Sequence, residues 1–166
     1  MRIRRRNQKE AIEITEEQLR ELVIEPFFSQ GEECFEERMV ELLEKDTSKI
    51  HGRAIDNTVY FPTLYFDDGE LSGICSCHPF QVYGPCKHMA ATGLAWIAKS
   101  QHGTYKPSPA YEARMLFFDT VYYILGQKSK KDLVSLLMDV IIDDPKKAFL
   151  LREDGALLLA DNDFWV

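Results

Sequence analysis

Apolar and polar positions in the first part of the chain recur at the spacing of α-helices. Thr15, followed three residues later by Gln18, has the pattern of a capping box that opens a helix. Ile14 is placed to pack on Leu19, and Pro26 ends the element. The pattern therefore predicts one short helix between Thr15 and Pro26.

A second helix is predicted from the same kind of signal. Ser29 and Glu32 repeat the S-x-x-E pattern of a helix start. Apolar residues follow at helical spacing, at Phe35, Met39 and Leu42 or Leu43. Cys34 lies beside this apolar stripe and is interpreted as a small buried hydrophobic residue.

From about Met39 the period changes, and the residues from 48 onward form short runs rich in β-branched and aromatic side chains. Three antiparallel strands are predicted, over 48–55, 58–66 and 70–75, with turns at Asp56-Asn57 and at 67–69. Pro62 interrupts the middle run. Because proline cannot donate a hydrogen bond to a strand ladder, we expect an edge position or a bulge there.

The helical period returns in the second half of the chain. Helices are predicted over 86–100, 107–126 and 129–143, the last capped by Ser129 with Asp132 three residues later. Asp144-Pro145 is expected to open a short final helix, and 155–166 form either a docked strand or an exposed end. The pattern as a whole predicts an α+β fold with N-terminal helices, a small antiparallel sheet and a C-terminal helical cap.

Charge changes the picture because it is unevenly distributed. The chain has 166 residues, with 20 Lys and Arg against 27 Asp and Glu, and a formal net charge of −7. This balance excludes a uniformly basic protein that wraps nucleic acid. Residues 1–9 carry five basic and no acidic side chains, whereas 10–46 carry thirteen acidic and three basic ones. The acidity therefore belongs mainly to the two predicted N-terminal helices.

The chain has no sequence signal for a membrane or for export. No apolar run approaches the roughly 18 to 20 residues that cross a bilayer, and the basic N-terminus lacks an apolar stretch behind it. We expect an intracellular protein without a membrane partner, located in the cytoplasm or, in a eukaryotic cell, in the nucleus.

Four residues have the chemistry of a metal site. Cys75-Ser76-Cys77 is followed, after eight residues, by Cys86-Lys87-His88. Zinc takes four thiolate or imidazole ligands in a tetrahedron, so the cluster Cys75, Cys77, Cys86 and His88 is predicted to hold one Zn²⁺. Gly73 and Gly84-Pro85 are expected to supply tight turns before each pair. Four protein ligands fill the coordination sphere, and the zinc would be structural.

Other interpretations of these residues are open at the level of sequence. The cysteines form either the metal site, a set of buried thiols beside an incidental histidine, or a redox pair at C-x-C. His78 is adjacent and competes with His88 as a ligand, or lies exposed beside the site. His51 and His102 have no partner visible in the sequence and are expected to be solvated or in the core.

The order C-x-C, short spacer, C-K-H and a helix rich in small residues, CSCHPFQVYGPCKHMAATGLAW, resembles the SWIM zinc finger family. The similarity extends over roughly 25–150 and is specific only at 75–96. The resemblance implies zinc at Cys75, Cys77, Cys86 and His88, and a role in DNA binding or protein interaction. The chain departs from multidomain relatives because it has no ATPase motor, phosphate-binding loop or transposase core.

With this resemblance, the predicted organisation has three parts. Residues 1–12 form a basic N-terminal arm, and 13–104 form a SWIM-type zinc finger domain with its core at 58–100. Residues 105–166 form a helical extension packed on the same domain. The zinc knuckle leads from the sheet into the helix that begins near residue 86.

The favoured function is a protein-interaction adaptor in DNA-associated processes such as recombination, repair or chromatin remodelling. The resemblance implies a RecA-like recombinase paralogue or a Swi/Snf-type ATPase as the protein partner. An acidic helical surface beside a neutral finger suits a basic protein better than phosphate. No small-molecule substrate is expected. The sequence has no nucleophile elbow, no carboxylate pair that stands out and no nucleotide-binding loop, so it does not indicate an enzyme.

The alternative is a weak, salt-dependent DNA-binding module. Its candidate phosphate contacts are scattered along the chain, at Arg4, Arg5, Arg6, Arg53, Lys87 and Lys99. The aromatic candidates for stacking on unpaired bases are Tyr60, Tyr65, Phe80 and Tyr83. Core and turn packing is the favoured explanation for them, because they alternate with polar residues as in half-buried strands.

Overall fold

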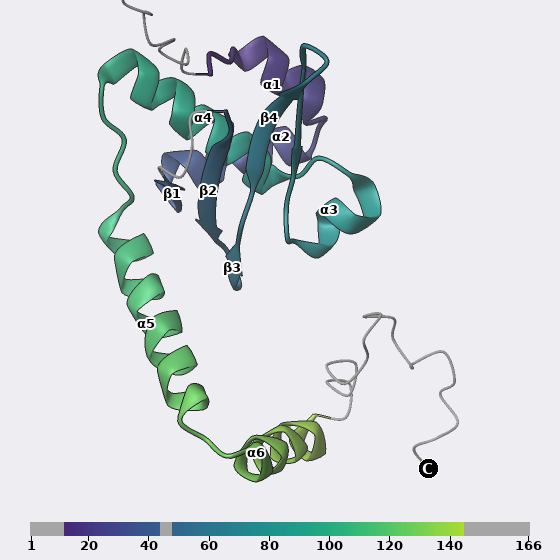
Figure 1. The fold of residues 1–166 in the computed structure, drawn as a ribbon, viewed down its shortest axis with the longest axis vertical. Helices are drawn as coiled ribbons and strands as arrows, with labels where there is room; N and C mark the ends of the chain where they lie inside the picture. Colours follow the sequence, from purple (N-terminus) through teal and green to yellow (C-terminus); the bar gives the residue numbers. More distant parts are fainter. Residues whose placement is uncertain (1–11, 44–47, 145–166) are drawn as a thin grey trace, which may run out of the picture. The chain divides into compact units, whose positions relative to one another are not determined.

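The computed structural model describes residues 12–43 and 48–144 (Figure 1). Arg4, Arg5 and Arg6, the helix expected from Asp144-Pro145 and the tail at 155–166 lie outside the described residues, apart from Asp144 itself. The chain divides into two units, Met1–Phe118 and Asp119–Val166, which are described separately. The expected division into an arm, a finger domain and a packed extension stays a prediction.

The first helix, α1 (Glu16–Leu22), begins as predicted. Thr15 Oγ1 accepts a hydrogen bond from the Gln18 amide at 3.2 Å, and Gln18 Oε1 accepts one from the Thr15 amide at 2.9 Å. Ile14 and Leu19 are both buried in the same hydrophobic cluster. The capping box and the adjoining apolar contact thus fix where the chain enters the helix.

The second helix, α2 (Phe27–Glu36), begins three residues before the start that a capping box at Ser29 predicts. Pro26 occupies the N-cap position, and Glu25 Oε2 accepts a hydrogen bond from the Ser29 amide in the first turn at 3.2 Å. The Ser29 hydroxyl donates to a carboxylate oxygen of Glu25 at 2.8 Å, not to Glu32. The expected S-x-x-E box is therefore wrong, because the turn that begins with Pro26 already starts the helix.

The helical spacing of Met39 and Leu42 or Leu43 does not correspond to a helix, because α2 ends before Met39, close to where the sequence pattern changes. Arg38 has a φ of 53°, a left-handed conformation that ends the helix. The strand β1 (Val40–Leu43) follows and pairs antiparallel with β2 (Ile50–Ile55). Pairing with a neighbouring strand overrides a helical spacing that continues in the sequence beyond residue 38.

The sheet is entirely antiparallel, as predicted, and has five strands. The remaining strands are β3 (Val59–Tyr60), β4 (Thr63–Asp67) and β5 (Glu70–Ile74). The order is β1-β2-β4-β5, with β3 also paired with β2 (Figure 1). The turns lie where the sequence places them, between β2 and β3 and between β4 and β5.

Pro62 separates β3 from β4 without shifting the register. Both strands pair with β2 in one register, with Ala54 opposite Tyr60 and Ile50 opposite Leu64. The Gly52 amide donates to the Pro62 carbonyl at 2.9 Å, and Pro62 has no amide to donate in return. The ladder is interrupted there, and no extra residue of a bulge is inserted.

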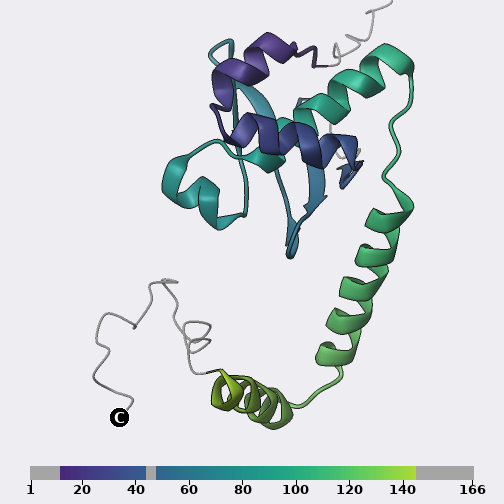
Figure 2. The same cartoon turned by 180° about the vertical axis from the view of Figure 1, so that it is seen from behind.

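Three helices cover one face of the sheet (Figures 1 and 2). The central one is α4 (Lys87–His102), predicted at 86–100, which packs against β1, β2 and β4 on one side and α2 on the other. Gly31 of α2 permits this approach, because a Cβ there would lie 2.5 Å from the Cβ of Ala90. A short helix, α3 (His78–Tyr83), lies between β5 and α4 and was not predicted.

The last two described helices are α5 (Pro109–Gly126) and α6 (Lys130–Asp143). In the first unit, Tyr111 and Met115 of α5 are buried with Met39 and Ile55. In the second unit, Ser129 and Asp132 form the capping box that the sequence predicts for α6. Among the described residues, no helix is both long and apolar enough to cross a membrane.

Candidate metal centre

The local fold brings together the four predicted ligands from three chain segments. Cys75 directly follows β5, and Cys77 is the N-cap of α3. Cys86 is the N-cap of α4, and His88 is the second residue of that helix. The expectation that Cys86 and His88 lie at the start of this helix is confirmed.

The four side chains form one buried cluster. Their ligand atoms all lie within 4.8 Å of one another, and His88 is 2% exposed. His88 Nδ1 lies 3.9 Å from Cys75 Sγ and 3.8 Å from Cys86 Sγ. Tetrahedral zinc places sulfur and nitrogen ligands about 3.6 Å apart and two sulfurs about 3.8 Å apart. The residues therefore fit one zinc ion, with His88 bound through Nδ1.

The protonation of the thiols depends on their mutual contacts. The hydrogen bond from Cys75, aided by those from His88 and the Met89 amide, lowers the pKa of Cys86 to about 4, against the effect of burial. The same Cys75–Cys86 contact, with burial, raises the pKa of Cys75 well above its ordinary value. Burial raises the pKa of Cys77 as well. The contact between Cys75 and Cys86 thus favours a single thiolate in this pair.

The imidazole of His88 packs against the Tyr60 ring, and its Nδ1 lies close to two cysteine sulfurs. The Tyr60 ring stacks on it with centroids 4.4 Å apart and planes at 29°. The Thr92 hydroxyl donates to the His88 carbonyl at 2.8 Å, which adds a bond at this turn of α4. Nδ1 faces the sulfurs, and Nε2 is buried with no hydrogen-bond partner in the described part of the chain. The ring orientation therefore presents Nδ1 to a metal.

The structure distinguishes the other cysteine and histidine residues from the cluster. His78 is exposed at the first position of α3 and does not join the cluster. Cys34 is half-buried elsewhere, and burial raises its pKa to about 11, in accord with the predicted packing role. His51 Nδ1 lies 3.1 Å from the Thr63 hydroxyl, and His102 is exposed.

The two glycines near the cluster have different roles. Gly84 has a φ of +86° and ends α3, so it supplies the predicted turn before Cys86. Gly73 lies inside β5 and supplies no turn, which corrects the expectation. A Cβ at Gly73 would lie 2.5 Å from the Thr63 carbonyl oxygen and 2.7 Å from Met89 Cε. Gly73 instead lets α4 approach the strand that leads to Cys75.

Two of the candidate phosphate contacts are engaged in ion pairs within the protein. Arg53 Nε donates to Glu41 Oε2 and to the Tyr111 hydroxyl, both at 3.0 Å. Lys87 Nζ lies 2.6 Å from Asp56 Oδ2, and this contact lowers the pKa of Asp56. Lys99 Nζ lies 5.7 Å from the centroid of the Trp96 ring.

The contacts of Tyr60 and Lys87 were missed at the sequence level. Tyr60 was a candidate for stacking on bases, yet it packs on His88. Lys87 was a candidate for phosphate, yet it binds the turn after β2 through Asp56. The pairing of β2 with β3 brings both partners to the start of α4, and the linear sequence carries no signal of that contact.

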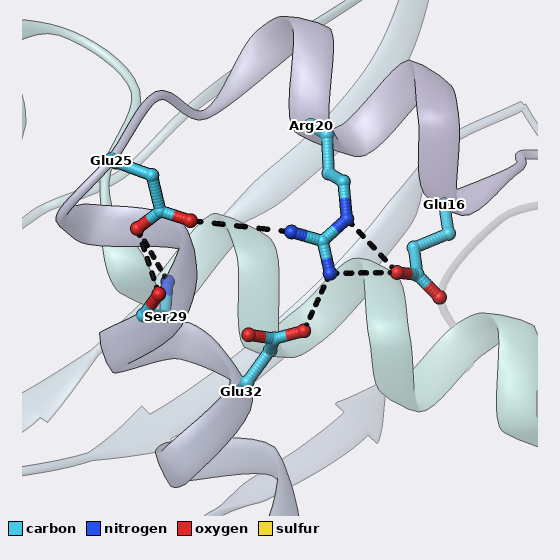
Figure 3. A network of polar contacts seen from close by, with 5 residues as sticks. All are labelled: Glu16, Arg20, Glu25, Ser29 and Glu32. Carbon is cyan, nitrogen blue, oxygen red and sulfur yellow. Dashed lines mark hydrogen bonds and ion pairs between the residues drawn. The ribbon is translucent and has the colours of Figure 1, made fainter.

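A polar network joins the two N-terminal helices (Figure 3). The Arg20 guanidinium of α1 binds Glu16 at 2.8 Å and Glu32 of α2 at 2.7 Å, and lies 4.0 Å from Glu25. The guanidinium carbon of Arg20 also lies over the Phe28 ring, 4.0 Å from its centroid. Residues 12–43 contain ten acidic side chains and two basic ones, so this segment has a formal net charge of 2 − 10 = −8.

Comparison with known proteins gives this chain no family. No family model matches the sequence, no curated protein matches it, and no solved structure matches it.

Proposed function

We propose that the chain is a zinc-stabilised interaction module that binds a basic segment of a protein partner. The observation that carries the proposal is the buried Cys₃His cluster, which joins the sheet to α4. The N-terminal helices supply the charged surface. We call α1, α2 and their flanking carboxylates the acidic helix pair. In this proposal the metal is structural, because four protein ligands fill a tetrahedral zinc site.

The charge of the acidic helix pair supports a basic partner. Glu17, Glu21 and Glu33 are exposed on α1 and α2. A groove of about 480 Å³ lies beside α1 and is lined by Gln18, Glu21, Leu22, Gly69, Glu70 and Leu71. A groove lined by two carboxylates and two leucine side chains suits a peptide that carries Lys or Arg together with an apolar residue.

The class of partner comes from the resemblance to SWIM fingers at 75–96. That resemblance favours a RecA-like recombinase paralogue or a Swi/Snf-type ATPase, in a process that involves DNA. Direct DNA binding gains no support from Arg53 and Lys87, since Glu41 and Asp56 pair with them. In the proposal the chain has no catalytic activity and no small-molecule substrate.

The metal is tested first, on the purified chain. We expect one zinc per chain by plasma mass spectrometry, and loss of that zinc in Cys86→Ser and His88→Ala. Cys34→Ser is the matched control, because Cys34 lies outside the cluster. A chain purified without chelators that holds no stoichiometric zinc contradicts the site.

The partner is tested by affinity capture from the source cell, with and without nuclease. We expect partners that survive nuclease treatment and are lost when Glu17 and Glu21 are changed to Lys. Asp119→Lys is the control, since it reverses an exposed charge outside the acidic helix pair. Loss of all partners on nuclease treatment, with salt-sensitive retention of DNA, would support the DNA-binding alternative and overturn the adaptor.

A further inference from the structure

A pocket of about 560 Å³ lies where the helices α2 and α4 both end. Its lining comes from these helix ends and from the loop between α4 and α5, and it includes Phe35, Arg38, His102, Thr104, Tyr105 and Lys106. All of these residues belong to the first unit. Pockets that hold small ligands have volumes of about 300–1,000 Å³, so this one has room for a molecule the size of a nucleotide.

The basic side chains of this pocket differ from the others of the first unit. Within the described residues, the side chains of Arg38 and Lys106 have no carboxylate, aromatic ring or hydrogen-bond partner. The other basic side chains described in this unit contact a carboxylate, a ring or a carbonyl oxygen, namely Arg20, Lys49, Arg53, Lys87, Lys99 and Arg114. The two bases without a partner thus line the same pocket.

Arg38 is held in a backbone conformation that arginine rarely adopts. Its φ of 53° lies in the left-handed region, and glycine is the usual residue at such a position after a helix. Its amide donates to the Phe35 carbonyl at 2.9 Å, and its carbonyl accepts from the Ser108 amide at 3.0 Å. The backbone requirement therefore does not explain an arginine here, whereas a ligand for its exposed guanidinium does.

The rest of the lining supplies an aromatic wall and further polar groups. Phe35 and Tyr105 are both half-buried, and their rings stack with centroids 5.8 Å apart and planes at 15°. Thr104 and His102 are exposed and line the same pocket. Guanidinium, ammonium and hydroxyl groups are typical donors to phosphate oxygens, and aromatic side chains are surfaces on which planar rings pack.

We propose that this pocket binds a single phosphate group carried on a planar ring, as in a nucleoside monophosphate. Arg38 and Lys106 bind the phosphate in this proposal, and Phe35 and Tyr105 pack against the ring. The ligand is bound without reaction, and no catalytic step is involved.

The charge around the pocket favours a small anion over a nucleic-acid strand. In the lining, two bases and the single acid Glu36 give a formal charge of +1 with His102 neutral. The last carbonyls of α2 and α4 add partial negative charge, and residues 12–43 carry ten acids against two bases. A compact ligand contacts the bases alone, whereas a strand that extends beyond the pocket would be repelled by the acidic helix pair.

The pocket is separate from the surfaces of the proposed function. None of its lining residues is a candidate metal ligand, and none lines the groove beside α1. A chain that captures no basic partner therefore still tests the pocket, and a chain that binds no nucleotide still tests the partner.

The test is isothermal titration calorimetry of the full chain with AMP at low salt. We expect a dissociation constant on the order of 10–100 µM. Arg38→Asn and Lys106→Gln should each weaken binding by at least about 10-fold, because each removes a charged donor to the phosphate. Asparagine tolerates the left-handed backbone at Arg38. Lys49→Gln is the matched control, since it removes the same charge outside the pocket and should change the constant by less than about two-fold.

Further ligands separate the phosphate from the ring. Adenosine, which lacks the phosphate, should bind at least about 10-fold more weakly than AMP, and inorganic phosphate should compete with AMP. Absence of AMP binding at about 1 mM overturns the proposal, and so does binding that neither substitution weakens. A single-stranded oligonucleotide without a terminal phosphate that binds more tightly than AMP overturns it as well, because the pocket would then bind a nucleic-acid backbone.

Discussion

At the scale of single residues, Tyr60 determines how rigidly the candidate metal ligand His88 is held. Its ring covers the imidazole, and its hydroxyl donates to Asn57 Oδ1 at 2.6 Å. Groups that hold a ligand in place contribute to metal affinity even though they do not touch the metal. Tyr60 thus has a role in the site that follows from packing and not from metal chemistry.

Removal of that ring should weaken zinc binding. Tyr60→Ala is expected to lower zinc affinity by about 10-fold, whereas Tyr60→Phe, which keeps the stacked ring, should stay close to the native value. Competition with a chromophoric chelator measures both. Equal losses in the two variants would show that the hydroxyl, and not the ring, positions His88.

The thiol pKa values predict how zinc binding depends on pH. Cys75 and Cys77 have raised pKa values and keep their protons at pH 7, whereas Cys86 is already ionised. Zinc binds thiolates, so binding at pH 7 should release about two protons, and affinity should rise as pH rises from 6 to 8. Calorimetry in buffers of different ionisation enthalpy counts the protons. Release of none would contradict these pKa directions.

At the scale of helices and strands, the contact between α2 and α4 supports the start of α4. Gly31 faces the backbone of that start, because a Cβ there would lie 2.8 Å from the Lys87 carbonyl oxygen. Cys86 and His88 flank Lys87 in sequence. A change in the distance between α2 and α4 would therefore displace the segment that holds Cys86 and His88.

Gly31→Ala should destabilise the first unit by about 1–3 kcal/mol, even though alanine favours helices more than glycine does. The added methyl group meets Ala90 and the backbone of α4. Gly126→Ala is the control, since nothing lies within 4 Å of a Cβ at that helical position. Urea unfolding of the zinc-loaded chains measures the difference, and equal midpoints for the two variants would contradict it.

The elements that the sequence predicts correctly are those with local signals. The capping boxes of α1 and α6 involve residues three apart, and both form as expected. The strand β1 was missed because it depends on pairing with β2, whose partner residues are eight to fourteen positions away in the sequence. The four metal ligands were found because their spacing is short, whereas their packing partner Tyr60 was not.

At the scale of the whole molecule, the metal cluster lies inside a hydrophobic core. Cys75, Cys77 and Cys86 are buried with residues of α1, α2, β2 and β4, among them Leu19, Phe28, Ile50 and Leu64. A metal bound there would therefore contact a region that several elements share. In the proposed function its binding would stabilise the first unit and not only a local loop.

Removal of zinc should lower the thermal stability of this unit strongly. Binding energies of structural zinc are on the order of 10 kcal/mol, and they add to folding stability when the unfolded chain binds the metal poorly. We expect the midpoint of thermal unfolding to fall by more than about 10 °C after chelation and to recover on addition of zinc. Circular dichroism during heating measures this midpoint. An unchanged midpoint would show that the core is complete without the ion.

The helix starts at Cys77 and Cys86 also determine which charge the core can hold. One zinc ion with three thiolates and a neutral imidazole carries about one net negative charge. Each helix N-terminus contributes about half a positive charge, and two of them meet at the cluster. The two partial positive charges together nearly balance the single negative charge of a zinc centre at this position. A fourth thiolate in place of His88 would leave one negative charge uncompensated in an apolar core, which is a physical reason for an imidazole at that position.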